Sequence, residues 1–228
     1  MNIAVILAAG ASRRLKGIDK IFYKIRGKPL IFYTILAFEK NPQVNKIILV
    51  VRKEFFKNIF SLIKKYNFKK VATIIKGGRE RQDSAFCGLK SAETLGAKPG
   101  DLILFHNGAN PLISQREISN VIKAAKKYKA ALVAQPARDT LKKITKNGFI
   151  LKTIDRRNIY LAQTPQVIEY KLAKTAFEKA SEKNFYGTDD VSLVEKLGRK
   201  VKIIPCSYKN IKVTTKEDLE VIEKLLEN

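Results

Sequence analysis

Arginine, the side chain best suited to binding phosphate, is concentrated in four short segments of this sequence. The chain has 11 arginines, and seven of them lie at positions 13 and 14, 79 and 81, 138, and 156 and 157. A guanidinium group donates two parallel hydrogen bonds to phosphate oxygens, which the ammonium group of lysine does not do. Lysine is instead scattered over predicted helices, where a solvated face is the simplest explanation. The clustering of arginine therefore favours a small polyphosphate ligand over a long polyanion.

The first arginine pair follows a turn of small residues. Ala8, Ala9 and Gly10 come directly after an apolar run, and Arg14 and Lys20 lie beyond them. Small side chains let backbone N–H groups approach an anion at the start of a helix. The turn has neither the G-x-G-x-x-G spacing of dinucleotide sites nor the G-x-x-x-x-G-K-[ST] spacing of P-loops. It therefore indicates a phosphate site of another kind or an ordinary loop.

Two further segments place small and polar residues directly after a predicted strand. One begins at Gly77 and Gly78, whose bare backbone could lie against a planar base, and ends at Ser84, whose hydroxyl could bond the edge of that base. The alternative is an ordinary loop in which Ser84 caps nothing in particular. The other segment runs from His106 to Pro111. Strand ends of this kind carry the ligand contacts in open α/β sheets.

These segments can meet only if strands and helices alternate along the chain. Apolar runs of strand length occupy residues 3–7, 46–51, 71–75, 102–105 and 131–134. Apolar residues spaced three and four apart predict amphipathic helices over residues 30–39, 53–66, 81–95 and 114–128. This order is typical of an α/β fold with a doubly wound, mostly parallel sheet.

The alternation breaks after Ala137. Residues 140–154 predict two strands about Asn147 and Gly148, the dipeptide that most readily supplies the two positive φ angles of a tight hairpin turn. A hairpin that projects from a sheet is marginally stable alone. We therefore expect residues 138–160 to form an arm that packs on a second subunit in a homodimer. The alternative is that the hairpin extends the edge of the main sheet.

The rest of the sequence returns to alternating elements. It predicts helices near residues 169–181 and 190–197, a strand at 202–205 and a last helix over 215–226, with Thr215 as its N-cap. We expect residues 1–228 to form a single domain, because a chain of this length can bury one large core.

Composition excludes several classes of protein. The chain has 45 basic and 21 acidic residues, a net charge of +24, and 45% hydrophobic residues, which is too apolar for a disordered chain. No stretch approaches the roughly 20 apolar residues of a membrane span, so we expect a cytoplasmic protein without a membrane partner. Two cysteines and one histidine supply neither a disulfide framework nor a zinc cluster. The charge is compatible with nucleic-acid binding, but its dispersal over lysines argues against a nucleic-acid partner.

Taken in order, the motif segments resemble the 2-C-methyl-D-erythritol 4-phosphate cytidylyltransferase family over essentially the whole chain. The most specific matches are L-A-A-G-x-x-x-R with a lysine beyond it, G-G-x-x-R-x-x-S, R-D-T, D-R with T-P-Q, and the late N-I-K-V-T. The resemblance implies a Rossmann-like nucleotide-diphospho-sugar transferase fold that dimerises through the arm. It also implies Mg²⁺-dependent transfer of CMP from CTP to 2-C-methyl-D-erythritol 4-phosphate, with release of pyrophosphate, in non-mevalonate isoprenoid biosynthesis.

The resemblance implies roles for three groups of residues. Those expected to hold the cytosine and ribose of CTP are Ala8, Ala9, Gly10, Gly77, Gly78 and Ser84. Those expected to surround the triphosphate as catalytic side chains are Arg14, Lys20 and Lys212. Those expected to bind the acceptor, with the arm of one subunit contributing to its neighbour's site, are Asn107, Asn110, Thr140, Arg156, Thr164 and Thr188.

The acceptor loop departs from the family pattern, which usually reads H-D-A-A-R-P. Asn107 replaces an aspartate that helps hold the metal and the acceptor, and an amide is a poorer Mg²⁺ ligand than a carboxylate. Asn110 replaces an arginine that contacts the acceptor sugar. Two alternative functions therefore remain. One is cytidylyl transfer to another polyol phosphate, such as ribitol 5-phosphate, and the other is non-catalytic binding of phosphate or nucleic acid.

Overall fold

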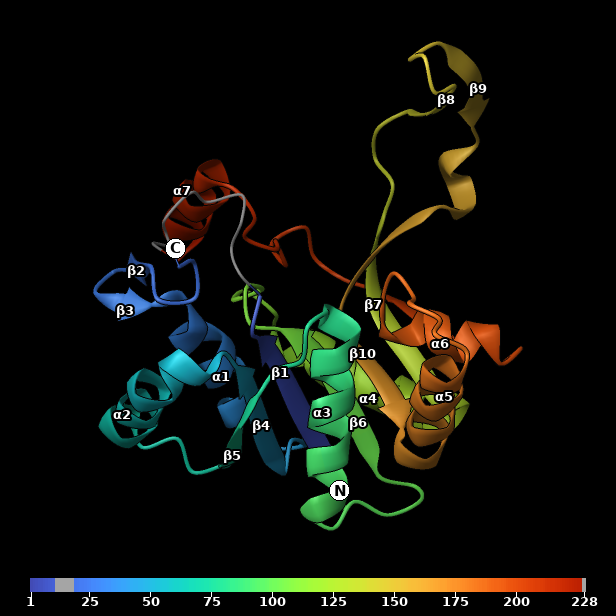
Figure 1. The fold of residues 1–228 in the computed structure, drawn as a ribbon. Helices are drawn as coiled ribbons and strands as arrows, with labels where there is room; N and C mark the ends of the chain where they lie inside the picture. Colours follow the sequence, from blue (N-terminus) through green and yellow to red (C-terminus); the bar gives the residue numbers. More distant parts are fainter. Residues whose placement is uncertain (11–18, 227–228) are drawn as a thin grey trace.

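The protein is described by a computed structural model that covers residues 1–10 and 19–226. Its main sheet has seven strands in the order β11-β7-β10-β6-β1-β4-β5 (Figure 1). The bounds of these strands, in chain order, are β1 (Asn2–Ala8), β4 (Lys46–Val51), β5 (Val71–Lys76), β6 (Leu102–Asn107), β7 (Ala130–Pro136), β10 (Tyr160–Glu169) and β11 (Lys202–Pro205). Six of the seven agree with the strands predicted from apolar runs to within two residues, and β10 was not predicted.

Helices cover both faces of this sheet, which confirms the doubly wound α/β fold. One face packs on α1 (Leu30–Lys40), α2 (Phe56–Tyr66) and α4 (Gln115–Tyr128). The other packs on α3 (Arg81–Thr94), α5 (Tyr170–Glu182) and α6 (Asp190–Lys196). Strand β1 is buried along its whole length, and alternate residues such as Ile3 and Ala4 enter different hydrophobic clusters because successive side chains point to opposite faces.

Strand β10 is the one strand of the main sheet that runs against the others. It pairs antiparallel with β6 on one side and with β7 on the other. Sequence analysis missed it because Pro165 interrupts the apolar run, and proline is disfavoured inside a central strand. The sheet accommodates Pro165 at an irregularity, where the pairing with β7 shifts between Ala162 and Gln166.

The hairpin of β8 (Leu141–Ile144) and β9 (Ile150–Ile154) forms a separate two-stranded sheet that stands clear of the main body (Figure 1). The hairpin therefore does not extend the edge of the main sheet, and its packing on a second subunit stays a prediction. The predicted turn is wrong in one respect, because only Gly148 has a positive φ, of 85°, and Asn147 does not. The Gly148 N–H donates to the Thr145 carbonyl at 3.1 Å, so a longer loop with one left-handed glycine closes the hairpin.

A small cap lies beside the carboxyl ends of the parallel strands. It consists of the short strands β2 (Lys24–Ile25) and β3 (Lys28–Pro29) with the last helix, α7 (Lys216–Leu225). Its apolar cluster joins Ile25 and Leu219 to Ala109 and Val213, which belong to two of the predicted motif segments. Thr215 caps α7 as predicted, because its side chain accepts a hydrogen bond from the Asp218 N–H. Among the described residues, no helix is long and apolar enough to cross a membrane.

Candidate nucleotide-transfer site

The motif segments meet at the carboxyl edge of the sheet, where the strand order changes direction between β1 and β6. After β1 the chain adds β4 and β5 on one side, and it then crosses to place β6 on the other side of β1. Crevices at such switch points are the usual ligand sites of open α/β sheets. The Gly108 N–H donates to the Leu7 carbonyl at 2.8 Å, which holds the loop after β6 against the end of β1.

Close packing of small residues joins the first two motif turns. A Cβ atom added at Gly77 would lie 2.4 Å from the Cβ of Ala9, so only glycine allows this approach. The Gly77 N–H also donates to the carbonyl of Val51 at the end of β4, at 3.0 Å. Two turns that are far apart in the sequence thereby form one surface of exposed backbone, as the predicted cytidine site requires. Gly10 continues that surface, and an added Cβ there would meet no described atom within 4 Å.

Ser84 holds the loop that contains Gly77 and Gly78 through hydrogen bonds of its side chain. Its side chain is buried, and its hydroxyl accepts a hydrogen bond from the Gly78 N–H and donates one to the Glu80 carbonyl, both at 3.1 Å. Ser84 therefore has a definite structural partner, contrary to the reading of an ordinary loop. Its contact with the edge of a base stays a prediction.

The late motif, which contains Lys212 and Val213, also lies at this edge of the sheet. Val213 is fully buried, and its N–H donates to the Ala109 carbonyl at 2.9 Å. The ammonium group of Lys20 donates to the Val213 carbonyl at 3.2 Å. Lys20 and the neighbouring Lys212 are thus brought to one segment, although 191 residues separate them in the sequence. Arg14, the third predicted catalytic side chain, lies outside the described residues.

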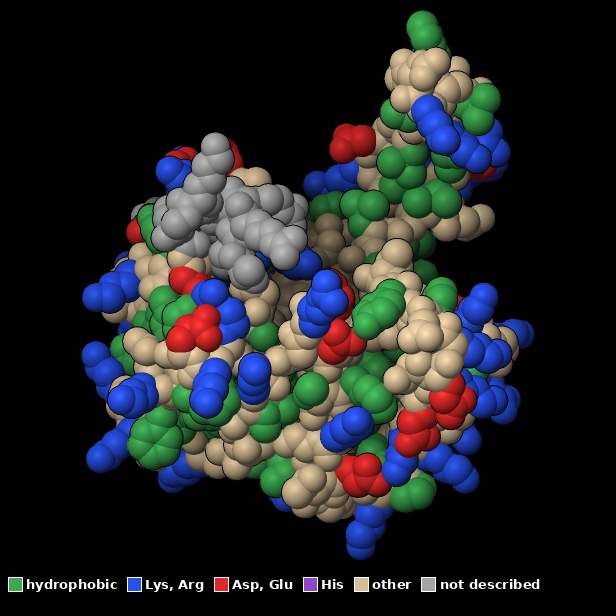
Figure 2. All heavy atoms as spheres, viewed as in Figure 1, with side chains coloured by type: hydrophobic (Ala, Val, Ile, Leu, Met, Phe, Trp, Pro, Cys, Tyr) green, Lys and Arg blue, Asp and Glu red, His purple; other side chains and the backbone are tan. Residues whose placement is uncertain are grey.

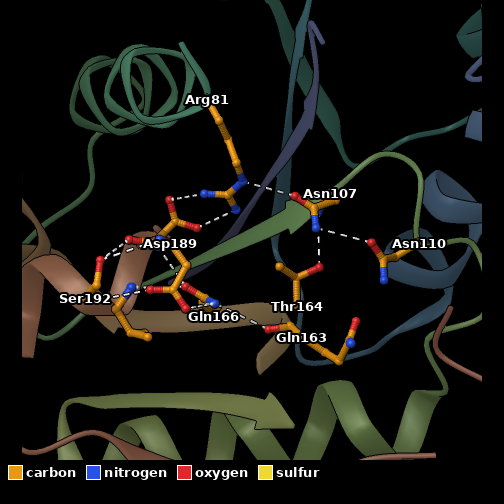
Figure 3. Close-up of polar contacts among 10 residues, drawn as sticks. Arg81, Asn107, Asn110, Gln163, Thr164, Gln166, Asp189 and Ser192 are labelled. Carbon is orange, nitrogen blue, oxygen red and sulfur yellow. Dashed lines mark hydrogen bonds and ion pairs between the residues drawn. The ribbon is translucent and has the colours of Figure 1, made fainter. Parts of the chain in front are cut away.

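A chain of amide side chains reaches this segment, and Figure 3 shows its first two members, Asn107 and Asn110. Asn107 donates through Nδ2 to Oδ1 of Asn110 at 3.2 Å, and Asn110 donates to Oδ1 of Asn210 at 3.3 Å. Asn210 then donates to the Thr164 carbonyl at 2.9 Å. The Thr164 hydroxyl accepts the backbone N–H of Asn107 at 3.2 Å. Three of the predicted acceptor residues therefore lie together, and Asn110, which has no exposed surface, has both of its amide atoms engaged.

Arg81 closes the other side of this network, and Figure 3 shows its side chain directed toward Asn107. The Arg81 guanidinium donates two hydrogen bonds to the carboxylate of Asp190, at 2.9 and 2.7 Å, and Asp190 is 1% exposed. Burial lowers the pKa of Arg81, but the charge of Asp190, its hydrogen bonds to the guanidinium and the nearby Asp189 charge together outweigh burial and leave that pKa above its ordinary value. The Arg81 side chain is therefore a cation at neutral pH. Gln166 holds the start of α6 by accepting the Asp190 N–H at 2.8 Å.

Sequence reasoning assigned no individual role to Arg81, Gln166, Asp190 or Asn210, although it counted Arg81 among the clustered arginines. Arg81, Gln166 and Asn210 lie in the motifs that carry the resemblance, and Asp190 lies two residues after Thr188. That placement is the only local signal they carry. Arg81 and Asp190 are 109 residues apart in the sequence, so no helix or strand period relates them. Their pairing depends on the folded arrangement of α3 and α6.

His106, the only histidine, is buried at the end of β6 against Phe38. Its Nε2 lies 3.0 Å from the Asn110 carbonyl, to which the neutral ring donates in one tautomer. Burial lowers the pKa of His106 to about 4, so the imidazole stays neutral near pH 7. A buried, weakly basic ring of this kind supports the acceptor loop and is unsuited to general base catalysis.

Thr140, Arg156 and Thr188 do not join the network. Thr140 and Arg156 lie exposed on the arm, where the Arg156 side chain donates to the Arg138 carbonyl. Thr188 is exposed directly before α6. Figure 2 shows the arm rising away from the body with an open space beside it. Within one chain, the predicted acceptor residues therefore fall into a buried group and an exposed group.

The described residues do not form a metal site at this edge. No cluster of three or more His, Cys, Asp or Glu side chains occurs among them that could hold a metal ion. Asn107 Oδ1 accepts a hydrogen bond from Arg81 Nε at 3.2 Å, and a cation beside that oxygen opposes a second one. Asp189 caps α6 through Oδ1 and accepts from Gln166 through Oδ2 at 2.8 Å, so its oxygens are also engaged. The donor set therefore does not fit a protein-held Mg²⁺.

Comparisons with known proteins agree on one family. A family model described as 2-C-methyl-D-erythritol 4-phosphate cytidylyltransferase matches residues 2–228. The protein of that name from Clostridioides difficile is 43% identical over 230 residues, which cover 99% of this chain and 94% of that protein. The one from Caldanaerobacter subterraneus is 43% identical over 229 residues, covering 99% of each chain.

Solved structures give the same answer. The 4-diphosphocytidyl-2C-methyl-D-erythritol synthase of Anaerococcus prevotii matches with a TM-score of 0.86 and 31% identity, covering 100% of this chain and 96% of that one. The 2-C-methyl-D-erythritol 4-phosphate cytidylyltransferase of Francisella tularensis matches with a TM-score of 0.82 and 32% identity, covering 98% of each.

Proposed function

The chain belongs to the 2-C-methyl-D-erythritol 4-phosphate cytidylyltransferase family, and we propose that it transfers CMP from CTP to 2-C-methyl-D-erythritol 4-phosphate and releases pyrophosphate. The observation that carries this proposal is the meeting of four motif segments at one sheet edge. Gly77 packs on Ala9, the Val213 N–H binds the loop after β6, and Lys20 reaches the Val213 carbonyl. Turns of small residues and the ammonium group of Lys20 converge there, which suits the binding of a nucleoside triphosphate.

Catalysis of this reaction depends on positioning the two substrates and stabilising negative charge, and not on a general base. A phosphate oxygen of the acceptor attacks the α-phosphorus of CTP, and a new P–O bond forms as the bond between the α- and β-phosphates breaks. The electron pair of that bond leaves with pyrophosphate. The attacking oxygen is already anionic, so no side chain has to remove a proton. The low pKa of His106, about 4, suits a site that uses no histidine base.

In this proposal each motif has one task. The turns that contain Ala8, Ala9, Gly10, Gly77, Gly78 and Ser84 hold the cytidine. Arg14, Lys20 and Lys212 surround the triphosphate and neutralise the charge that develops in the transition state. The acceptor set consists of Asn107, Asn110, Thr140, Arg156, Thr164 and Thr188. Of these, Asn110 has no exposed surface and contributes through its hydrogen bonds to Asn107 and Asn210.

Two further parts of the proposal concern partners. The exposed positions of Thr140 and Arg156 on the arm support a homodimer in which residues 138–160 of one subunit complete the acceptor site of the other. Mg²⁺ remains part of the proposal as a cation that would offset the negative charge of the CTP phosphates. The described protein oxygens would not hold it, because they are engaged elsewhere. We place the reaction in the cytoplasm, where CTP is made.

The test is pyrophosphate release by the purified protein from CTP and Mg²⁺ with 2-C-methyl-D-erythritol 4-phosphate. Release that requires the acceptor supports the assignment. A parallel reaction contains ribitol 5-phosphate, because Asn107 and Asn110 replace two charged family residues in the acceptor loop. Release with ribitol 5-phosphate but not with 2-C-methyl-D-erythritol 4-phosphate would change the assigned acceptor and leave cytidylyl transfer as the reaction. Absence of release with either acceptor, in protein whose melting temperature does not rise with CTP, would refute cytidylyl transfer.

A further inference from the structure

Four side-chain hydrogen bonds run in a single direction through the acceptor side of the site. The first is donated by Arg81 Nε to Asn107 Oδ1, at 3.2 Å. The amides of Asn107, Asn110 and Asn210 then each donate onward, and the last bond ends on the Thr164 carbonyl. These bonds link α3, the loop after β6, the late motif and β10. They therefore connect the nucleotide side of the site to the segment that carries Lys212.

The direction of this chain is fixed by its two ends. A guanidinium group only donates hydrogen bonds and a backbone carbonyl only accepts them. Asn107 must therefore turn its oxygen to Arg81, which leaves its NH₂ group for Asn110, and the same constraint passes to Asn210. Asn110 and Asn210 have no exposed surface. A reversed amide would leave buried groups mismatched without water to replace the lost bonds, which is costly.

Arg81 is in turn held in place by Asp190. Both terminal nitrogens of its guanidinium bind the two oxygens of that buried carboxylate. This planar, bidentate contact leaves Nε directed at Asn107. The start of α6, which carries Asp190, is itself held by Gln166 at 2.8 Å. The first donor of the amide chain thus has one available orientation.

We propose that Arg81 is a positioning residue, which with Asp190 fixes the direction of the amide chain Asn107–Asn110–Asn210 and so the shape of the acceptor pocket. It acts through Asn107 and touches neither substrate. The family's usual pair at these positions, an aspartate and an arginine, would run the second link in the opposite direction, since only the arginine could donate. This hydrogen-bond direction therefore depends on the asparagines that this protein has at the two positions. The inference rests on the proposed function for its kinetic readout.

The kinetic test compares Arg81→Gln and Arg81→Lys with a matched control. Arg81→Gln should lower kcat/KM for the acceptor by roughly 10- to 100-fold, because small displacements at a reacting group have effects of this size, while the Kd of CTP changes by less than about threefold. Arg81→Lys keeps the charge but not the planar fork, so its loss should be smaller. The control is Lys174→Gln on α5. It removes an exposed ion pair of 2.5 Å with Glu93, which lies on the same helix as Arg81, and should leave both constants unchanged.

A structural readout makes the test independent of turnover. The side-chain NH₂ signals of Asn107, Asn110 and Asn210 in ¹⁵N NMR spectra should shift together in the Arg81 variants and stay in place in Lys174→Gln. If wild-type protein has no transferase activity, the proposed function fails, and these spectra still decide whether Arg81 orders the chain.

Two results would overturn the inference. One is a folded Arg81→Gln protein with unchanged acceptor kcat/KM and unshifted amide signals. The other is a loss of CTP affinity as large as the loss for the acceptor, which would make Arg81 a direct phosphate ligand. If Arg81→Gln does not fold, as judged by its thermal melt, the same two criteria apply to Arg81→Lys.

Discussion

At the level of single residues, Lys20 links the first motif to the last. Its ammonium group donates to the carbonyl of Val213, the residue that follows Lys212. An ammonium group carries three N–H donors, so a bond to one carbonyl does not by itself prevent a lysine from binding phosphate. Lys20 thereby combines a structural contact with the predicted catalytic one.

Replacing Lys20 separates these two contributions. We expect Lys20→Ala to lower kcat by roughly 100-fold or more, because it removes a charge aimed at the reacting phosphate, while the thermal melt stays close to that of wild type. Exposed Lys24, on β2 nearby, gives the control variant Lys24→Ala, which should keep full activity. Near-normal turnover in Lys20→Ala would remove Lys20 from the catalytic set.

His106 leads to a prediction about the pH dependence of stability, because its imidazole ring is buried in the neutral form. The unfolded chain takes up its proton near pH 6.5, whereas the folded protein does so only near pH 4. The unfolded state therefore binds more protons in this interval, and stability falls as the pH is lowered through it, by up to about 3 kcal/mol. Urea unfolding from pH 7 to pH 4 should show a steeper loss of stability in wild type than in His106→Gln. In that variant only carboxyl groups with lowered pKa values, such as those of Asp101 and Asp218, still contribute. A histidine signal that titrates near pH 6.5 in NMR spectra of the folded protein would contradict the expectation.

At the level of elements, the site is built where a strand end meets the start of a helix or loop. The turn after β1 and the loop before α3 touch through Ala9 and Gly77, without side chains between them. Helix α3 begins with a capping box in which Asp83 accepts the Glu80 N–H at 2.9 Å. These local contacts fix the backbone of both turns before any ligand arrives, which lowers the entropy lost on binding.

The Gly77 contact can be tested by adding one methyl group and then making room for it. Gly77→Ala should weaken CTP binding by about tenfold or more, since a Cβ there overlaps Ala9 Cβ and forces the turns apart. Adding Ala9→Gly removes that overlap and should recover part of the affinity. Isothermal titration with CTP measures both variants. Equal affinities for wild type and Gly77→Ala would show that the spacing of the turns does not govern binding.

At the level of the whole molecule, the arm leaves apolar side chains in water. Phe149 is 73% exposed and Ile150 is 64% exposed, near the tip of a two-stranded sheet that packs on nothing else within the described chain. Large apolar side chains gathered in one place mark interaction surfaces more often than isolated ones do. The arm therefore supports the proposed homodimer.

Charges placed on the arm should separate the subunits. We expect the wild-type protein to have the mass of a dimer in light scattering, and the double variant Phe149→Ser with Ile150→Lys to have the mass of a monomer with reduced activity. The control is Phe60→Ser, because Phe60 is 65% exposed but lies on α2, away from the arm. A monomeric wild type that is fully active would exclude a shared acceptor site.

Much of this structure follows from the sequence alone. Apolar runs and amphipathic spacings located six strands of the main sheet and the helices that cover it, because each pattern reflects a local backbone geometry. The small-residue turns could be assigned to ligand binding because parallel strands bring their carboxyl ends to one edge. The N-cap of α7 was also local, since Thr215 and Asp218 are three residues apart.

The tertiary structure alone decided the remaining features. Strand β10 joins the sheet against the direction of its neighbours despite Pro165, because its pairing partners lie on two distant strands. Asn147 does not have the predicted positive φ, because a longer loop closes the hairpin. The pairing of Arg81 with Asp190 and the direction of the amide chain depend on which groups meet after folding, across 109 residues in the first case. Periodic patterns in a sequence report local backbone structure. Hydrogen bonds between residues that are so far apart in the sequence produce no such pattern.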